Sequence, residues 1–520
     1  MELRQFVHRC KQSYPEKVAY IDGGRQFTWR EVCDRSCRLA AGLQGLGLRK
    51  GEVAAILCHD HIEAVEHVFA CLEIGAVRVG VNRGYSTAEM LHVIRDSDAR
   101  VIIVQASCRP LIESHLAALR AEGRFIVGFG AGHGQEIDYE KLIAASPEAP
   151  EPVAVAFDDP AAISYTSGTT GYPKGVIFKQ GGMRDMFVHF VLSTGLRHED
   201  VWLNPTSMAW ATFMLNVMSV VNGMTTVLQG GDFKAENFLD LCSRHRVTSV
   251  VVVPVMLQRL IATYEQSRQL YDLSALRVVT YGSAPASPTL IESAIRTFGV
   301  ELIQLYGLTE FCAWATFLQH GDHLKALAGR PDILTSCGRP GLHCELSIRD
   351  ENGVPVERGR MGELWLRSET LMLGYRNLPE LTAEVLHGDW LRTHDIGYED
   401  EEGYVHLTDR RHFLIITGAA NVFPSIVENT VAAHPRVREV AVGGAPPPEW
   451  GGAAVTMVAL KEPGSANAAD LIAWCQGKVA KWEVPKHVEI VDELPKGPTM
   501  KVLKKQIKER YAARPDLLPW

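Results

Sequence analysis

The sequence predicts an α/β fold, in which a large N-terminal domain of two layered α/β subdomains and a small β-barrel precedes a small α+β C-terminal domain. Short β-rich runs alternate with amphipathic segments through the first two-thirds of the chain. Several of these runs are near-continuous in Val and Ile, as in parallel strands that are buried on both faces. After Cys337 the pattern changes to short alternating strands separated by Gly and Pro turns, which is typical of a small antiparallel barrel or sheet.

The first strands and helices follow from hydrophobic periodicity. Strands are expected at 18–21, 53–57 and 99–104, and the amphipathic segment 29–44 is expected to be a helix that ends at a Gly-Leu-Gly stop. Two further Val- and Ile-rich runs, at 247–255 and 276–281, are predicted to be buried parallel strands. The alternating glycines at positions 128, 130, 132 and 134 do not fit a dinucleotide-binding spacing and indicate a surface loop.

The last third reads as two smaller units. Strands are expected at 344–349 and 362–367, then at 439–442 and 454–460. An amphipathic helix near 469–482 and a basic helix after Lys501 complete the prediction. We expect an N-terminal domain over residues 1–410 with the barrel at about 337–410, a C-terminal domain over 411–520, and a hinge at about 410–413.

Composition excludes several classes of function. The chain has 520 residues, and 53 Lys and Arg against 61 Asp and Glu give a net charge of -8, so no global basic surface is available for nucleic acid. No apolar run approaches the roughly 18 residues of a membrane span, and the first residues lack the layout of a secretory signal. A cytoplasmic protein is expected.

Of the 11 cysteines, the pair closest in sequence is Cys33 and Cys37, with no matching His or Cys pair nearby, so the cysteines are expected to be small buried hydrophobes rather than metal ligands.

The strongest local signal is the segment 163–176. A strand-like start leads into a loop rich in Ser and Thr hydroxyls, with glycines that let backbone N–H groups turn toward an anion and one lysine, Lys174. It is not a Walker A motif, because Lys174 follows a proline and precedes Gly175. The alternative is a Ser/Thr/Gly-rich surface turn, but the ordered spacing favours a polyphosphate site.

The segment 165–175 resembles the signature of the adenylate-forming enzymes, the superfamily of acyl- and aryl-CoA synthetases, nonribosomal peptide adenylation domains and luciferases. Four later segments look like further motifs of this superfamily in the same order: 306–310, 393–395, 409–410 and 496–501. The resemblance covers nearly the whole chain and is closest to stand-alone acyl- or aryl-CoA ligases. It implies that a carboxylic acid is activated with ATP as acyl-AMP, with release of pyrophosphate, and is then transferred to coenzyme A.

The resemblance also implies roles for individual residues. Glu310 would bind Mg²⁺, Thr309 would donate to the α-phosphate, and Lys501, the third catalytic candidate, would bridge the carboxylate and the α-phosphate. Taken alone, Glu310 reads as a solvated acid and Lys501 as one lysine on a basic helix. The expected nucleotide-binding residues are Thr166, Ser167, Gly168, Thr169, Thr170 and Lys174 for the phosphates; Gly282, Ser283, Ala284, Tyr306 and Gly307 for adenine; and Asp395 and Arg410 for the ribose.

The acid pocket is expected at Met208, Trp210, Met214 and Phe311. Many aryl-acid members of the superfamily carry histidine at the place of Met208, and the sequence offers no obvious cation for a second carboxylate. A bulky apolar or aromatic acid bound by hydrophobic contact is therefore predicted. No aspartate stands where amino-acid activators hold an α-amino group. The alternative is that these side chains simply belong to the hydrophobic core.

Departures from the superfamily pattern fall mostly on the thiolation half-reaction. His412 and Phe413 stand at the pivot about which the C-terminal domain is expected to move as a lid. Ala420, Met500 and His394 also depart from the pattern, which has glycine at the positions of Met500 and His394. An adenylation-only enzyme that passes its acyl-AMP to a carrier protein or a separate thiolation enzyme is therefore the alternative. A non-catalytic nucleotide-binding homologue is the remote one, since the candidate charged residues are all present.

Overall fold

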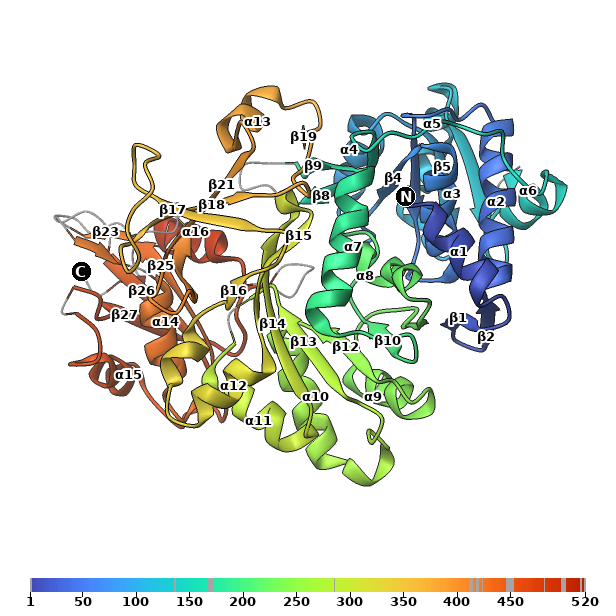
Figure 1. The fold of residues 1–520 in the computed structure, drawn as a ribbon. Helices are drawn as coiled ribbons and strands as arrows, with labels where there is room; N and C mark the ends of the chain where they lie inside the picture. Colours follow the sequence, from blue (N-terminus) through green and yellow to red (C-terminus); the bar gives the residue numbers. More distant parts are fainter. Residues whose placement is uncertain are drawn as a thin grey trace.

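The computed structural model describes residues 2–134, 137–166, 172–284, 286–410, 415–417, 420–422, 424–445, 453–480, 482–496, 502–514 and 517–518. Two large α/β layers, blue to yellow in Figure 1, lie to the right and below, and the C-terminal part, orange to red, lies to the left. Among the described helices, none is long and apolar enough to cross a membrane.

The first α/β layer is a sheet with the strand order β19-β9-β8-β4-β3-β5-β6-β7. Its inner strands pair in parallel, whereas β8 and β9 form an antiparallel hairpin. The strands are β3 (Val53–Leu57), β4 (Val77–Gly80), β5 (Ala99–Gln105), β6 (Phe125–Phe129), β7 (Ile137–Asp138), β8 (Pro160–Thr166), β9 (Lys174–Lys179) and β19 (Gly374–Tyr375). The accompanying helices are α2 (Trp29–Gly45), α3 (Ile62–Ile74), α4 (Thr87–Asp96), α5 (Leu116–Ala121), α6 (Tyr139–Ala145) and α7 (Gln180–Thr194).

The helices of this layer begin where the sequence offers caps. Thr28 accepts from the backbone N–H of Glu31 at the start of α2, and the Glu31 side chain returns the bond. Ser86 and Glu89 form the same capping box at the start of α4. Each box satisfies backbone donors that a helix start leaves unpaired, which explains why these helices begin at these residues.

The second α/β layer is a sheet with the order β16-β15-β14-β13-β12-β10-β11-β1-β2. Its strands are β1 (Val18–Asp22), β2 (Arg25–Thr28), β10 (Val201–Asn204), β11 (Thr225–Leu228), β12 (Ser249–Val252), β13 (Val278–Gly282), β14 (Glu301–Leu308), β15 (Ala313–Leu318) and β16 (Arg339–Pro340). The remaining helices of the first two-thirds are α1 (Gln5–Ser13), α8 (Phe213–Val217), α9 (Ala235–Arg244), α10 (Pro254–Gln266), α11 (Pro288–Phe298) and α12 (His320–Leu327). A large hydrophobic core, which includes the fully buried Trp29 and Trp202, draws residues from both layers.

The region after Cys337 is an antiparallel sheet of β17 (Glu345–Arg349), β18 (Gly362–Arg367), β21 (Trp390–Glu399) and β20 (Leu386–His387), with β22 (Val405–Arg410) also paired to β21. Helix α13 (Pro379–Val385) precedes β20. Among the described residues, no pairing joins the outer strands β17 and β22, so of the two expected alternatives, a small antiparallel barrel or a sheet, the region forms the sheet.

The C-terminal part is α+β, as expected. Its described elements are β23 (Ile415–Thr417), β24 (Ala420–Val422), α14 (Pro424–Ala432), β25 (Val437–Ala445), β26 (Ala453–Leu460), α15 (Ala468–Cys475), β27 (His487–Ile490) and α16 (Lys504–Ala513). Strands β25, β26 and β27 form one sheet, and β23 and β24 form a small hairpin.

The α/β fold class is confirmed, and three local expectations are wrong. The Val-rich run 247–255 is a strand only over β12, because Pro254 begins α10, where a proline at the first helical position has no N–H to satisfy. Helix α15 ends at Cys475, earlier than expected. Gly128 lies inside β6, whereas Gly130 and the next two alternating glycines adopt the left-handed conformations of a loop.

Candidate active site

The hairpin of β8 and β9 carries the predicted phosphate loop. Its register pairs Thr166 with Lys174, so the two strands bring the first and last polar residues of the motif opposite each other. The candidates between them, Ser167, Gly168, Thr169 and Thr170, lie outside the described residues. The strand on either side of the motif agrees with the strand-like start read from the sequence.

Lys174 and Glu310 are brought together by a residue that the sequence motifs did not single out, Tyr375. The Lys174 Nζ lies 4.9 Å from the centroid of the Tyr375 ring. The Tyr375 hydroxyl donates a 2.6 Å hydrogen bond to Oε1 of Glu310. One tyrosine thus contacts the candidate phosphate lysine with its ring and the candidate metal carboxylate with its hydroxyl.

Backbone pairing holds this arrangement. Strand β19 pairs with β9 so that Tyr375 faces Val176, and the N–H of Met372 donates to the carbonyl of Glu310 at 3.0 Å. Gly374, directly before Tyr375, has a φ of 145°, a conformation that glycine adopts readily. The segment of β19 is therefore the support that fixes Tyr375 between β9 and Glu310.

Thr309 and Glu310 begin a single 3-10 turn directly after β14. Glu310 is half-buried, and its carboxylate oxygens are hard donors of the kind that Mg²⁺ prefers. The donor chemistry and the neighbouring phosphate hairpin therefore fit a magnesium–phosphate group held at Glu310.

Tyr306 and Asp395 also meet, although 89 residues separate them. The Tyr306 hydroxyl donates to Oδ2 of Asp395 at 2.6 Å. Asp395 is 6% exposed, and its backbone N–H donates to Oγ1 of Thr393. The register of β21 and β22 pairs Asp395 with Arg410, which places the two ribose candidates on neighbouring strands.

The turn after β13 lies beside Tyr306. Gly282 pairs with Leu305 of β14, and a Cβ at Gly282 would lie 2.3 Å from the Leu305 carbonyl oxygen, so only glycine fits there. Ser283 follows with a φ of 67°, and Ala284 is the last described residue of the turn. Gly307, just after Tyr306, lies at a register shift between β14 and β15. The adenine candidates therefore gather at the ends of β13 and β14.

His394 adopts a φ of 60°, a left-handed conformation that explains why the superfamily pattern places glycine at this position. Its Nδ1 lies 3.0 Å from Oε1 of Glu363, and Arg392 binds the same carboxylate through two hydrogen bonds. Burial tends to raise the pKa of Glu363, but the hydrogen bonds from His394 and Arg392 outweigh it and lower that pKa to about 2. The left-handed residue beside Asp395 is thus held by its side-chain contact with Glu363.

The four acid-pocket candidates differ in exposure and in the part of the core that they contact. Met208, Met214 and Phe311 are almost completely buried and belong to the main hydrophobic core. Trp210 is half-buried and meets the ring of Tyr85 edge-on, with 5.7 Å between ring centroids.

Two charged residues bind the backbone of Met208, and the sequence patterns pointed to neither. Its N–H donates to Oδ1 of Asp60 at 2.8 Å, and its carbonyl accepts from Nη2 of Arg78. Arg78 is 1% exposed, and its guanidinium lies 4.2 Å from the ring centroid of Phe213. Its Nε and Nη1 have no hydrogen-bond partner among the described residues. A buried cation therefore contacts the backbone of one acid-pocket candidate, Met208.

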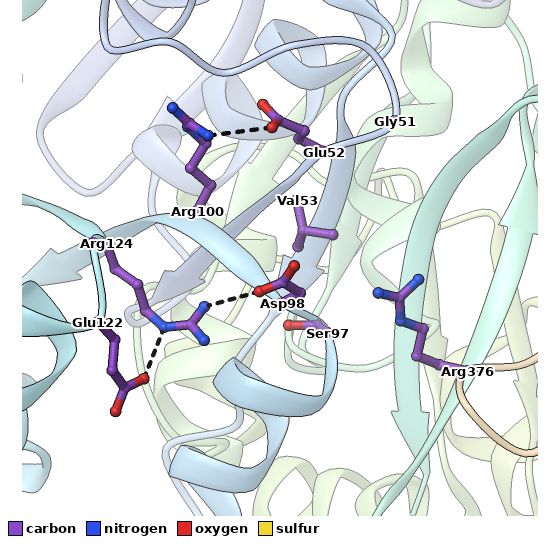
Figure 2. Close-up of a pocket in the computed structure, with 10 residues that line it drawn as sticks. Gly51, Glu52, Val53, Ser97, Asp98, Arg100, Glu122, Arg124 and Arg376 are labelled. Carbon is purple, nitrogen blue, oxygen red and sulfur yellow. Dashed lines mark hydrogen bonds and ion pairs between the residues drawn. The ribbon is translucent and has the colours of Figure 1, made fainter.

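A surface pocket of about 260 Å³ lies elsewhere in the first layer. It adjoins the amino-terminal ends of β3, β5 and β6, and no predicted site residue lines it. Figure 2 shows ion pairs among several of its charges: Arg124 with Asp98 and Glu122, and Arg100 with Glu52. The hinge residues His412 and Phe413, and Met500 and Lys501 of the last motif, lie outside the described residues.

Comparisons with known proteins agree with the motifs. The AMP-binding enzyme family matches residues 7–376, and the AMP-binding enzyme C-terminal domain matches residues 426–501. A feruloyl-CoA synthase from an Amycolatopsis species is 33% identical over 507 residues, covering 97% of this chain and 98% of the relative. An indoleacetate–CoA ligase from Aromatoleum aromaticum is 31% identical over 516 residues, covering 99% of each chain.

Two solved structures extend the likeness to the fold. The anthranilate CoA ligase AuaEII in complex with anthranoyl-AMP aligns with a TM-score of 0.91 at 28% identity, over 99% of this chain and 98% of that chain. The amide bond synthetase McbA from Marinactinospora thermotolerans aligns with a TM-score of 0.87 at 30% identity, over 98% and 100%. The resemblance read from the motifs is confirmed: the chain belongs to the AMP-binding enzyme family.

Proposed function

We propose that this protein activates an aryl or bulky apolar carboxylic acid with ATP, forming an acyl adenylate and pyrophosphate, and then transfers the acyl group to coenzyme A. It is an AMP-forming acid–CoA ligase by class, since relatives matched over almost their whole length, such as feruloyl-CoA synthase and indoleacetate–CoA ligase, are ligases of this kind. The nature of the acid, the roles of single residues and the use of Mg²⁺ are part of the proposal.

The observation that carries the proposal is the contact of Lys174 and Glu310 with one tyrosine. Adenylation brings a carboxylate to a triphosphate, so positive charge must gather where two anions meet. Lys174 lies over the ring of Tyr375, and Glu310 accepts the hydroxyl proton of the same side chain. Lys174, which would bind phosphate oxygens, and Glu310, which would bind a metal ion, thus contact the same tyrosine.

The other candidate residues bind the remaining parts of ATP and the acid. A Mg²⁺ ion bound at Glu310 would supply further neutralisation of the phosphate charge. Lys174 and the hydroxyls from Thr166 to Thr170 hold the β- and γ-phosphates, and Thr309 donates to the α-phosphate. Tyr306, with Gly282, Ser283, Ala284 and Gly307 around it, faces adenine, and Asp395 and Arg410 hold the ribose. Lys501 bridges the attacking carboxylate and the α-phosphate as a compact positive charge.

The division of the chain into a core over residues 1–410 and a lid over 411–520 belongs to the same proposal. The separate sheet and helices of the C-terminal part support it. A lid that delivers Lys501 for adenylation and then withdraws it lets the thiol of coenzyme A reach the acyl adenylate while water is kept out.

The expected acid is aromatic or bulky and apolar. Met208, Met214 and Phe311 are apolar but almost completely buried, whereas the half-buried Trp210 retains an exposed aromatic surface. The names of the relatives agree, because ferulate and indoleacetate are aromatic acids. Arg78 behind Met208 adds a reason to test acids with a second carboxylate, such as the 2-succinylbenzoate of another relative.

A second candidate function follows from the likeness to the amide bond synthetase. In this case the acyl adenylate would pass to an amine, or to a carrier protein as in the fatty acid–acyl-carrier-protein ligase ScoC from Streptomyces coeruleorubidus, which is 30% identical. The departures at the pivot, His412 and Phe413, lie on the part of the chain that the second half-reaction uses.

The deciding experiment combines ATP and Mg²⁺ with ferulate, indoleacetate, 2-succinylbenzoate, anthranilate, decanoate and phenylalanine, and follows pyrophosphate release. Productive acids are then incubated with coenzyme A or with an amine, and products are identified by mass spectrometry. A CoA thioester of an aromatic acid is the expected result. Formation of the acyl adenylate followed by an amide product, without a thioester, would favour the second function. If none of the acids supports pyrophosphate release, both functions are overturned.

A further inference from the structure

Helices α1 and α2 bring together three metal-ligating side chains on the side of the molecule formed by the N-terminal helices. His8 comes from α1, and Cys33 and Cys37 come from α2, the two helices that lie together in blue in Figure 1. One ligand atom from each lies within 4.8 Å of the others. The sequence offers no His or Cys pair near these two cysteines, but the packing of the two helices brings His8, 25 residues before Cys33, against them.

The spacing of these atoms fits a tetrahedral site. Cys33 and Cys37 are four residues apart on one helix, so their thiols lie on the same face. The Cys33 Sγ lies 3.5 Å from Nδ1 of His8. With zinc–sulfur bonds of about 2.3 Å and zinc–nitrogen bonds of about 2.0–2.1 Å at a tetrahedral angle, sulfur and nitrogen lie roughly 3.6 Å apart. The separation between His8 and Cys33 is close to this value, and the other two pairs of ligand atoms lie within 4.8 Å.

A buried carboxylate orients the histidine. Nε2 of His8 lies 2.7 Å from Oε1 of Glu73, whose side chain is 7% exposed. This contact is an ion-pair distance, and Oε1 of Glu73 accepts no hydrogen bond among the described residues. A carboxylate so close to Nε2 favours a proton on that nitrogen, which leaves the lone pair on Nδ1, the nitrogen that faces Cys33. A carboxylate behind a ligand histidine is the usual way that proteins fix the ring and raise its basicity.

Exposure differs between the ligands in a way that suits an ion bound from solvent. Cys33 and Cys37 are 1% and 7% exposed, whereas the His8 side chain is 42% exposed. The thiols are thus shielded from other reagents, and the histidine side leaves room for an ion to enter and for a water molecule as fourth ligand.

We propose that His8, Cys33 and Cys37 form a binding site for a zinc-type divalent cation, with Glu73 positioning His8. Zinc binds the two sulfurs as thiolates, and the two thiol protons pass to solvent. The site joins α1 to α2, and none of its residues belongs to the candidate active site. Its effect is therefore on the stability of the N-terminal helices.

The test uses the full-length protein, reduced and freed of metal by a chelator, and titrated with Co²⁺. One equivalent per chain is expected to produce a thiolate-to-cobalt charge-transfer band. C33S and C37S should each lower the affinity at least tenfold and reduce the band, and E73Q should weaken binding roughly 10- to 100-fold while one equivalent still binds. C10S is the matched control, because Cys10 is buried on α1 outside the cluster, where its thiol donates to the Val220 carbonyl.

A measurement on the unmutated protein keeps the test independent of how the variants fold. Native mass spectrometry with Zn²⁺ should show one zinc ion bound with the loss of two protons, and zinc should raise the thermal midpoint of the wild type but not of C33S/C37S. The proposal is overturned if the wild type gives no cobalt band, or if a folded C33S/C37S variant binds Co²⁺ as tightly as the wild type.

Discussion

Tyr306 and Asp395 are joined by a 2.6 Å hydrogen bond from the tyrosine hydroxyl to the carboxylate. The resemblance gave these residues separate parts of the nucleotide, the adenine ring and the ribose. Their direct contact means that the position of the aromatic ring and the orientation of the carboxylate depend on each other.

Tyr306→Phe is therefore expected to weaken ATP binding although the ring remains. A hydrogen bond to a charged group contributes about 1.5–3 kcal/mol, so KM for ATP should rise roughly 10- to 100-fold. KM for the acid should change little. Steady-state pyrophosphate release, with each substrate varied in turn, checks this.

The matched control is Tyr404→Phe. The Tyr404 hydroxyl donates to Oδ1 of Asp322 at 2.7 Å, a bond of the same kind outside the candidate site. It should lower the thermal midpoint without changing KM for ATP. Equal effects of both variants on KM would show that the Tyr306 contact has no special relation to the nucleotide.

Tyr375→Phe separates the two contacts of this residue. The ring that lies under Lys174 is kept, but the hydroxyl that orients Glu310 is lost. Since loss of a group that orients a metal ligand costs about 10- to 100-fold in affinity or activity, the Mg²⁺ concentration for half-maximal pyrophosphate exchange should rise by that order. Tyr375→Leu should add a further loss in ATP affinity, and an unchanged Mg²⁺ requirement in Tyr375→Phe would remove Tyr375 from the account.

The features that the sequence predicted correctly are those that depend on local motifs and on the period of hydrophobic residues. Strand β18 was expected at 362–367 and occurs over Gly362–Arg367, because an alternating run between turns has few other solutions. Lys174 and Glu310 were candidates because they stand inside motifs. Tyr375 was not, since it reaches Glu310 across 65 residues through the pairing of β19 with β9, and no local pattern contains that pairing.

The same reason explains the other omissions. Arg78 reaches Met208 across 130 residues, and His8 reaches Cys33 only because two helices pack together. The strand expected at 247–255 failed for the opposite reason. The strand was expected to continue through the whole hydrophobic run, although Pro254, a local signal for a helix start, lies within it.

Asp60 should make stability depend on pH. Burial raises its pKa to about 6, although the N–H of Met208 and nearby positive groups oppose the shift. The folded state thus binds a proton that the unfolded chain releases near pH 4, so stability conferred by this group falls as the pH rises from about 4 to about 6. D60N should therefore gain stability relative to the wild type across that interval. Urea unfolding at pH 4, 5, 6 and 7 measures the difference, and a constant difference would refute a raised pKa.

Glu363 should act in the opposite direction. Its pKa is lowered to about 2, because the hydrogen bonds from His394 and Arg392 outweigh the effect of burial. The stabilisation is fully present above the unfolded pKa of about 4.3 and is lost as the pH falls toward 2. The wild type should therefore lose more stability than E363Q between pH 5 and pH 2.5 in urea unfolding. E236Q, which changes an exposed carboxylate of α9, should follow the wild type.

Lys501→Ala tests the electrostatic centre of the proposed function. Removing a group that neutralises charge in a transition state costs about 10²–10³ in rate, so ATP–pyrophosphate exchange should fall by that order while KM for ATP rises little. Lys504→Ala is the matched control, because Lys504 lies three residues later and binds Glu428 at 2.9 Å. Thioester formation from a chemically prepared acyl adenylate should survive in Lys501→Ala, since the role proposed for this lysine is confined to the first half-reaction. Undiminished exchange in this variant would assign the bridging charge to another residue.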